Sequence, residues 1–348
     1  MANRISRLIM VFELTDNLCE YPLEREAQIL ICITNLLIGY YEGNHLLMAS
    51  ELLCDHFQSK LSDSRAKSAL NYLKNHCSFS YDVDWIMQVV INDDKNNLHE
   101  ISIDFFEKTS SIQPVHILCE NAQDVDFFIN ICKMYSKDTN INYIAYNGGG
   151  SDTAQNLRRL QNNNFLGLVI VDTDKRFPDD DFGETYKKVE KVSRRKVKHI
   201  FLHTLNFHEI ENLLPFSFLI KITNSNGCDF LKKIASIGDV AKEILRFYDM
   251  KKGITLDAIQ NDDSYYNFAA ELYKRLYKSN IEGFTKHIDS LIRKRNNAVF
   301  PPIRQDAINK YLNDKNKYYP INYFEDEWHM LAKIILTFSC AREDLPIS

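Results

Sequence analysis

The chain has 348 residues, of which 45% are hydrophobic and 26% charged, and its formal net charge at pH 7 is -5. This length predicts two or three domains that can fold without disulfides, and the negative net charge excludes a global attraction to nucleic acid. Eight cysteines without a C-x-x-C pair exclude a zinc ribbon or a redox dithiol and indicate a reduced, cytoplasmic protein. The longest apolar helix expected, at 29–41, is too short for a bilayer, which needs roughly 20 residues.

The first part of the chain predicts helices followed by a β-hairpin. The helices are expected at 23–41, at about 46–57, and from a cap at Ser62 or Ser64 onward. Two strand-like runs follow at 85–91 and 99–105, joined by a polar turn. Helices followed by a hairpin in this order are typical of a winged helix, a module used on DNA and on protein partners. A helical adaptor with a small sheet fits the same pattern equally well.

From residue 115 the pattern changes to alternating strands and helices. Strands are expected at 115–119, 141–146, 167–171 and 199–205, with helices near 125–135, 153–161 and 183–192. This alternation implies a parallel sheet with right-handed crossovers. After it, helices are expected at 230–248, 265–277, 281–293 and 324–338. The predicted fold class is therefore α/β, with an N-terminal helical or winged-helix-like module at 1–112, a central domain at 113–222 and a C-terminal helical region at 223–348.

Acidic side chains follow two of the predicted strands. Asp172 and Asp174 come directly after the apolar run 167–171, and Glu120 follows the strand at 115–119, with Asp124 four residues later. Ligands of open parallel sheets bind at the carboxyl ends of the strands, and clustered carboxylates repel one another unless a cation offsets them. Hard oxygen ligands suit Mg²⁺ or Mn²⁺. The acids therefore predict a metal site, although an Asp-x-Asp after an apolar strand also occurs in glycosyltransferases and phosphatases.

Several motifs together occur in the order and spacing of a TOPRIM domain. They are Glu120 with Asp124, Asn147-Gly148-Gly149-Gly150, Val171-Asp172-Thr173-Asp174 and Glu209-Ile210-Glu211-Asn212. In detail the chain resembles the OLD-like branch of stand-alone nucleases in anti-phage defence, including PARIS-type nucleases. The resemblance covers roughly residues 113–255 and leaves the N-terminal region unexplained.

The resemblance implies roles for the matching residues. Glu120 would bind metal or act in general acid/base catalysis, Asp172 and Asp174 would bind metal, and Asp124 matches the downstream acid of the first motif. Glu209 and Glu211 match acids that help to bind a second metal ion. Asn121 replaces the glycine that usually follows the first acid, so this turn would need a φ above zero that asparagine tolerates.

Basic residues near these motifs are candidates for contacts with a phosphate. Lys251 and Lys252 look like a lysine motif that follows the TOPRIM core, although they also fit a helix end capped by Gly253. The candidates for tracking a nucleic-acid backbone are Arg158, Arg159, Arg194, Arg195, Lys196 and Lys198. Charge runs of this kind are more often solvated faces.

The resemblance implies a metal-dependent endonuclease that hydrolyses phosphodiester bonds in DNA or in a structured RNA such as tRNA, with two Mg²⁺ or Mn²⁺ ions. It further implies a toxic, cytoplasmic effector of anti-phage defence that a partner ATPase or sensor controls, and it is compatible with a homo-oligomer. Two alternatives stay open. One is a catalytically silent TOPRIM-like module that binds nucleic acid or a partner, and the other is a Mn²⁺ glycosyltransferase that uses Asp172 and Asp174.

Overall fold

The computed structural model describes residues 10–76, 85–94, 96–136, 139–194, 197–238, 240–315, 319 and 321–341. The residues that contact one another in space form two compact units. The first comprises 1–170, 189–203 and 329–348, and the second comprises 171–188 and 204–328. Within the described ranges, no helix combines the length and the apolar character needed to cross a membrane.

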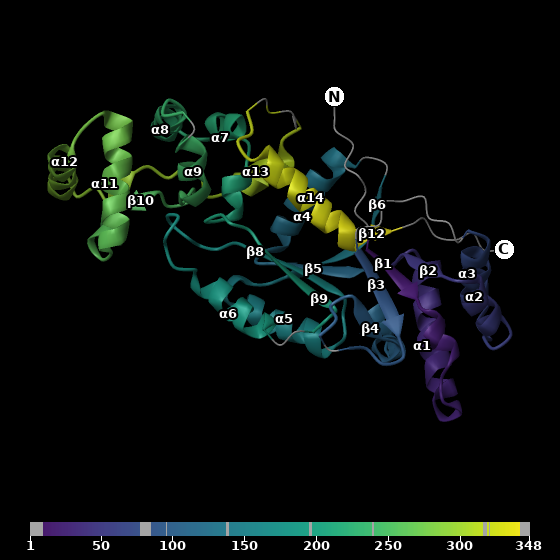
Figure 1. Ribbon diagram of the computed structural model, residues 1–348. Helices are drawn as coiled ribbons and strands as arrows, with labels where there is room; N and C mark the ends of the chain where they lie inside the picture. The colour runs from purple at the N-terminus through teal and green to yellow at the C-terminus, as the bar shows by residue number, and fades with distance from the viewer. Residues whose placement is uncertain are drawn as a thin grey trace. The chain divides into compact units, whose positions relative to one another are not determined.

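A parallel sheet opens the first unit, with its strands in the order β2-β1-β3-β4. The strands are β1 (Met10–Leu14), β2 (Leu47–Ala49), β3 (Trp85–Val90) and β4 (Glu100–Ser102). The helices of this region are α1 (Glu26–Tyr41), α2 (Glu51–Gln58) and α3 (Ser64–Asn75), as Figure 1 traces. Helix α1 buries Ile29, Ile33, Leu36 and Tyr40 because residues three or four apart share one face of a helix.

The winged-helix prediction is wrong. A wing needs an antiparallel hairpin, but β3 and β4 pair in parallel, with Gln88 opposite Glu100. The other edge of β3 is covered by β1, and Val89 and Val90 are both buried, as in strands covered on both faces. The expected helix at 46–57 is also shorter, because residues 47–49 form β2 and the helix begins after a cap at Ser50.

The cap of α3 differs from the predicted one. Neither Ser62 nor Ser64 caps the helix; the Asp63 carboxylate accepts the backbone N–H groups of Arg65 and Ala66. An aspartate in this position satisfies amide groups that have no partner within the helix. The predicted helix itself is confirmed, and it spans Ser64–Asn75.

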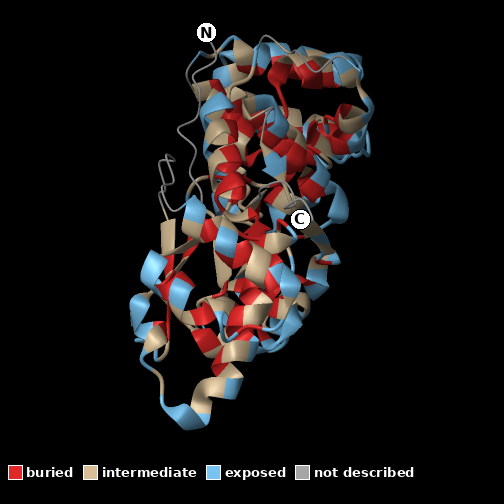
Figure 2. Cartoon of the chain, turned by 90° about the vertical axis from the view of Figure 1, so that its right-hand side faces the viewer, coloured by how far each residue is buried: buried red, intermediate tan, exposed pale blue. Residues whose placement is uncertain are grey.

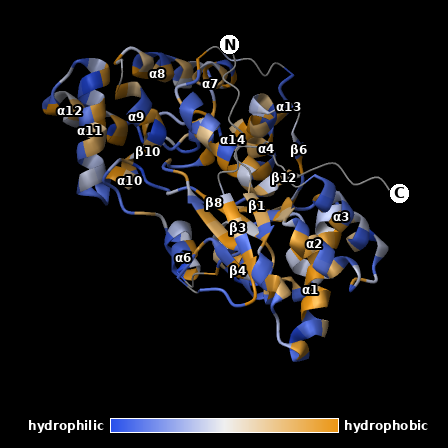
Figure 3. Cartoon of the chain, turned by 45° about the vertical axis from the view of Figure 1, so that its right-hand side comes forward, coloured by the Kyte–Doolittle hydropathy of each residue, from blue (hydrophilic) through white to orange (hydrophobic). Residues whose placement is uncertain are grey.

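The α/β class with a parallel sheet is confirmed by the second sheet, in the order β7-β5-β8-β9. Its strands are β5 (Val115–Cys119), β7 (Tyr143–Asn147), β8 (Gly167–Val171) and β9 (Ile200–Thr204). Strand β5 runs parallel to both β7 and β8. All residues of β5 and β8 are buried, and Figure 3 shows the apolar colour of β8. The helices α4 (Ala122–Tyr135), α5 (Thr153–Asn162) and α6 (Glu184–Ser193) alternate with these strands along the chain.

The remaining short strands form two antiparallel pairs. In the first unit, β6 (Asn140–Ile141) pairs with β12 (Cys340–Ala341), which follows α14 (Glu325–Ser339). In the second unit, β10 (Ile254–Thr255) pairs with β11 (Ala298–Phe300). Strands β8 and β9 and helices α6 and α14 each continue from one unit into the other.

The second unit is mainly helical, as predicted for the C-terminal region. Its helices are α7 (Phe216–Ile222), α8 (Ser225–Ala235), α9 (Val240–Phe247), α10 (Leu256–Gln260), α11 (Asp263–Tyr277), α12 (Ile281–Arg293) and α13 (Ala307–Asn313). Figure 2 colours the buried residues of the chain red. The single helix expected at 230–248 is instead divided into α8 and α9, with Gly238 between them at a φ of +70°. A left-handed residue interrupts an α-helix, which explains the division.

Candidate metal centre

The loop after β8 holds the two acids of the Asp-x-Asp motif in a fixed conformation. The backbone N–H of Thr173 donates to the Phe207 carbonyl over 3.0 Å, and its hydroxyl donates to the same oxygen over 2.6 Å. Asp174 has a φ of +54°, which is uncommon for a residue other than glycine, and its N–H donates to the His208 carbonyl over 3.1 Å. One carboxylate oxygen of Asp172 lies within 4.8 Å of one of Asp174.

Gly183 leaves the space that the Asp174 side chain occupies. A Cβ atom at this position would lie 2.2 Å from Oδ2 of Asp174, closer than any side chain tolerates. The N–H of Gly183 also donates to the Thr173 carbonyl over 2.9 Å, which closes the loop between the motif and α6. The glycine therefore leaves room for the Asp174 side chain in this position.

Arg176 holds the loop between Asp174 and Gly183. Its guanidinium binds both oxygens of Asp180, over 2.8 and 3.1 Å, and one oxygen of Asp262 over 2.7 Å. The acidic loop at 179–181 is only partly exposed: Asp179 and Asp181 face solvent, whereas the Asp180 side chain is 10% exposed. Bidentate pairs of this kind fix geometry as well as charge.

The Glu209–Leu213 segment brings a second pair of acids into the same unit. The side chains of Glu209 and Glu211 are buried. Asn212, which follows Glu211, is fully buried. The Asn212 amide donates to the carbonyls of Leu245 and Tyr248 over 2.6 and 2.7 Å and accepts the Glu209 N–H over 2.9 Å. Asn212 thus joins the acidic segment to the chain at the end of α9, a role that sequence reasoning missed.

Lys251 lies between the two glutamates. Its ammonium is 3.0 Å from Oε2 of Glu209 and 2.9 Å from Oε1 of Glu211. Burial and the neighbouring Glu211 raise the pKa of Glu209 to about 7, although Lys251 opposes the shift. Oε2 of Glu211 is buried and has no hydrogen-bond partner among the residues that the structure describes. Of the two lysines of the motif, Lys251 therefore contacts acids, whereas Lys252 is exposed.

The turn that carries Lys251 is organised by Asp249 and Gly253. Oδ1 of Asp249 accepts the N–H groups of Lys251 and Lys252 over 3.0 and 2.6 Å. Gly253 has a φ of +71°, and its N–H donates to the Asp249 carbonyl over 2.8 Å. The predicted left-handed glycine is confirmed, but it ends this turn, since α9 already ends at Phe247.

His208 connects the Asp249 turn to the loop after Asp174. Its Nδ1 donates to the Lys175 carbonyl over 3.0 Å, and its Nε2 lies 3.6 Å from Oδ2 of Asp249. Burial alone would lower the pKa of His208, but the carboxylates of Asp249, Glu209 and Asp174 outweigh it and raise that pKa. Ligand atoms of His208, Glu209 and Asp249 all lie within 4.8 Å of one another.

Negative charge dominates the second unit's acidic site, defined as Asp172, Asp174, Glu209, Glu211 and Asp249. Burial raises the pKa of Asp174, against the opposing effect of His208, Lys251 and Lys252. Desolvated carboxylates without enough countercharge are costly, and a divalent cation offsets that cost. These groups could hold a metal ion, as the sequence predicted.

Glu120 lies in the first unit, directly after β5. Its backbone carbonyl accepts the N–H groups of Gly149 and Gly150 over 2.9 and 3.2 Å, and the Cys119 carbonyl accepts the Gly148 N–H over 2.7 Å. These glycine amides therefore donate to carbonyl oxygens within the protein. Strand β8 runs parallel to β5 as its neighbour in the sheet, and Glu120 follows the carboxyl end of β5.

Asp124 caps the helix that follows Glu120. Its Oδ2 accepts the Asn121 N–H over 3.0 Å, and the two side chains form a reciprocal capping box at the start of α4. Asn121 has a φ of -128°, so the turn needs no left-handed residue and the missing glycine costs no backbone strain. The expectation of a positive φ at this position is wrong. The capping role accounts for Asp124, whose part in metal binding stays a prediction.

The predicted nucleic-acid-binding residues have different surroundings. Arg158 and Arg159 are exposed on α5, and Arg194 is exposed with an ion pair to Glu190. Lys198 is 11% exposed and pairs with Asp93 over 2.7 Å, so its charge is already matched within the first unit. Arg195 and Lys196 lie outside the described residues.

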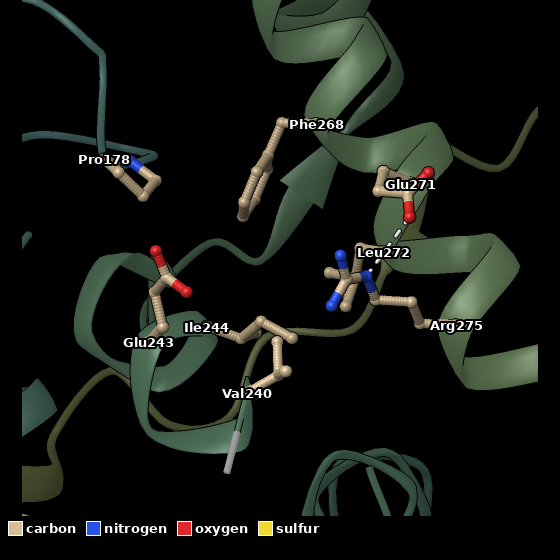
Figure 4. A pocket seen from close by; sticks show the side chains of 8 residues that line it. All are labelled: Pro178, Val240, Glu243, Ile244, Phe268, Glu271, Leu272 and Arg275. Atoms are coloured by element: carbon tan, nitrogen blue, oxygen red, sulfur yellow. Dashed lines mark hydrogen bonds and ion pairs between the residues drawn. The ribbon is translucent and has the colours of Figure 1, made fainter. Parts of the chain in front are cut away.

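A separate pocket of about 180 Å³ lies in the second unit (Figure 4). Its apolar lining comes from Pro178, Val240, Ile244, Phe268 and Leu272, and its charged lining comes from Glu243, Glu271 and Arg275. Arg275 donates to Glu271 over 3.2 Å, as the dashed line in Figure 4 shows. No residue of the predicted site lines this pocket. Pro178 belongs to the loop that follows Asp174.

Comparison with protein-family models, with curated proteins and with solved structures found no match to this chain. The site is therefore described by its own geometry. Beyond the predicted acids, that geometry adds Asn212, Arg176 and Asp249 to the residues that build it. Asp249 stands beside the predicted lysines in the sequence, which is the one signal that could have identified it.

Proposed function

We propose that this chain is a metal-dependent hydrolase of phosphodiester bonds, with a TOPRIM-type arrangement around β8. The observation that carries the proposal is the convergence of Asp172 and Asp174 with the segments of Glu209 and Lys251 in one unit. Hydrogen bonds from the Asp174 N–H to the His208 carbonyl and from the Met250 N–H to Glu209 hold these segments together. Preorganised groups of this kind cost no rearrangement during a reaction.

The residues have distinct roles in this proposal. Divalent ions, when bound, would supply an activated water and offset the charge that develops on the phosphate. Asp172 and Asp174 hold such an ion, because their carboxylates lie close together and the Asp174 backbone is held by its hydrogen bond to the His208 carbonyl. The resemblance adds Glu120 to the ligands or to the acid/base groups, and this role rests on the sequence.

The lysines supply positive charge for the substrate. Lys252 is exposed and its N–H is fixed by Asp249, so its ammonium is free to meet a phosphate from solvent. Lys251 is held by Glu209 and Glu211 and offsets part of the charge of these two acids in the absence of substrate. A phosphodiester backbone attracts such cations irrespective of base sequence.

DNA or a structured RNA such as tRNA is the proposed substrate, and Mg²⁺ or Mn²⁺ is the proposed ion. Control by a partner ATPase or sensor, and a role as a toxic effector of anti-phage defence, extend the proposal along the family resemblance. The experiment that tests the reaction incubates the purified chain with supercoiled DNA and with tRNA, each with Mg²⁺, with Mn²⁺ or with EDTA. Cleavage products are resolved on gels.

Asp172→Asn and Asp174→Asn are each expected to reduce cleavage by at least about 100-fold, because each removes a charge that the ion needs. Asp181→Asn is the matched control, since Asp181 is an exposed acid of the same loop. Its cleavage should equal that of the unmodified protein. Cleavage that survives Asp172→Asn, or that continues in EDTA, would contradict the proposal. A chain that binds nucleic acid without cutting it would favour the catalytically silent module.

A further inference from the structure

We infer that His208, Glu209 and Asp249 form a binding site for a first-row transition-metal ion, distinct from the Asp172 and Asp174 pair. One ligand atom of each lies within 4.8 Å of the others, and all three belong to the second unit. The inference goes beyond the proposed hydrolysis, because the ion would bind here whether or not the chain cuts a phosphodiester. It assigns His208 as a ligand, which neither the acid motifs nor the lysine motif requires.

The imidazole of His208 is oriented as a metal ligand. A backbone carbonyl can only accept, so Nδ1 carries the proton in its hydrogen bond of 3.0 Å to Lys175. In the neutral ring the lone pair is then on Nε2, the nitrogen that faces Asp249. Histidines that bind metals characteristically donate their other N–H to a backbone carbonyl or a carboxylate, which fixes both tautomer and ring orientation.

The separation of the donor atoms suits an ion between them. Two ligands that are each about 2.0 to 2.2 Å from one ion stand about 2.8 to 3.1 Å apart in octahedral geometry and about 3.3 to 3.6 Å apart in tetrahedral geometry. Nε2 of His208 and Oδ2 of Asp249 are 3.6 Å apart, at the upper end of the tetrahedral range. The same distance is long for a hydrogen bond between a nitrogen and a carboxylate oxygen.

Both carboxylates keep capacity for an ion after their present contacts. Asp249 uses Oδ1 for the N–H groups of Lys251 and Lys252, which leaves Oδ2 directed at His208. Glu209 accepts the Met250 N–H at Oε1 and the Lys251 ammonium at Oε2, and its side chain also forms a capping box with the Asn212 N–H. A carboxylate has about four lone-pair sites, so Glu209 retains about one for an ion.

The ligand types decide which ion is expected. One imidazole nitrogen with two carboxylates suits Mn²⁺, Co²⁺ or Zn²⁺ better than Mg²⁺ or Ca²⁺, which prefer oxygen ligands alone. The affinity of a nitrogen-containing site rises from Mn²⁺ to Zn²⁺. We therefore expect Zn²⁺ to displace Mn²⁺ from this site at a much lower concentration than Mg²⁺ does.

Pulsed electron paramagnetic resonance of the full chain loaded with Mn²⁺ tests the inference. A directly bound imidazole gives a nitrogen modulation of the Mn²⁺ echo, and the modulation is expected in a variant that carries Asp172→Asn and Asp174→Asn. His208→Asn should abolish it, because the asparagine amide can replace Nδ1 toward the Lys175 carbonyl but offers no ring nitrogen. His76→Asn, at an exposed histidine that ends α3, should leave it unchanged.

Asp249→Asn is a second test variant. It is expected to keep the fold, since the asparagine side-chain oxygen can still accept the backbone N–H groups of Lys251 and Lys252. Its Mn²⁺ affinity is expected to fall at least tenfold, as for loss of one charged ligand. Absence of nitrogen modulation from the protein, its persistence in His208→Asn, or equal displacement by Zn²⁺ and Mg²⁺ would overturn the inference. Loss of cleavage without loss of this signal would count only against the hydrolase proposal, so the two failures are distinguishable.

Discussion

Single residues decide how the buried charge in the second unit is balanced. Lys251 places one ammonium between Glu209 and Glu211, and Asn212 fixes the backbone that carries both acids. One cation between two carboxylates leaves net negative charge in a buried place, which is why the pKa of Glu209 is raised. The acids are thus held close together at a cost that a bound metal ion would remove.

The raised pKa of Glu209 predicts a pH dependence of stability in the metal-free protein. The folded state holds this proton up to a pKa of about 7, whereas the unfolded chain releases it near 4.5. The stabilising contribution is therefore full below the unfolded pKa and is lost as the pH rises through about 7. Urea unfolding at pH 5 and pH 8 in EDTA measures the loss against Glu209→Gln, which stays neutral throughout.

The difference in unfolding free energy between the variant and the unmodified protein should shift in favour of the variant by up to about 3 kcal/mol over this range. The difference is the quantity to follow, because burial lowers the pKa of His45 and of His116 to about 4 and gives these histidines the opposite slope. Saturating Mn²⁺ should abolish the shift. A difference that does not change with pH would contradict the assigned environment of Glu209.

Only part of the site could be predicted residue by residue. Asp172 and Asp174 were predictable because a fully apolar strand is a local pattern and the residues that follow it mark its end. Asp124 has the same residue type, but its contact with Asn121 makes it a helix cap. Asn212 could not be assigned a role, since its partners Leu245 and Tyr248 are remote in sequence.

At the scale of elements, strands and helices were predicted better than their pairing. Strands β5 and β8 match the expected ranges because apolar runs identify strands directly. The parallel pairing of β3 with β4 needs a connection that returns the chain to the end of the sheet where β3 begins, and β1 pairs with the other edge of β3; neither feature is encoded in the runs themselves. The two strand-like runs at 85–91 and 99–105 therefore fitted an antiparallel hairpin, whereas the strands pair in parallel.

The turn from Asp249 to Gly253 allows a test at the same scale. Gly253→Ala should destabilise the protein by about 1 to 2 kcal/mol through its left-handed backbone and by a further 1 to 3 kcal/mol through overpacking. The second contribution arises because a Cβ at this position would lie 2.3 Å from the Phe300 carbonyl oxygen. Denaturant unfolding measures both.

Gly238→Ala is the matched control for this substitution. Gly238 has a φ of +70°, nearly that of Gly253, but beyond its chain neighbours no atom of the described residues lies within 4 Å of the Cβ it would gain. Only the backbone contribution should therefore appear. Equal losses for the two variants would show that the contact with Phe300 does not constrain the turn that carries Lys251.

At the scale of the whole molecule, a net charge of -5 gives no overall attraction to the proposed polyanionic substrate. Local charge must therefore bring phosphate to the site, and the exposed Lys252 is suited to this role, whereas Lys198 is already paired with Asp93. Composition predicted the need for local cations but could not identify them. Whether a lysine forms an ion pair depends on which acids the fold brings close to it, as Asp93 is brought to Lys198, and not on its neighbours in sequence.

The most direct test of the central claim is an anomalous difference map from a crystal of the full chain grown with Mn²⁺. The account predicts a peak bound by Asp172 and Asp174 and a second peak bound by Nε2 of His208 with Glu209 and Asp249. Metal to oxygen or nitrogen distances should be about 2.0 to 2.3 Å. A map without a peak at these acids, with Lys251 still between Glu209 and Glu211, would contradict the account.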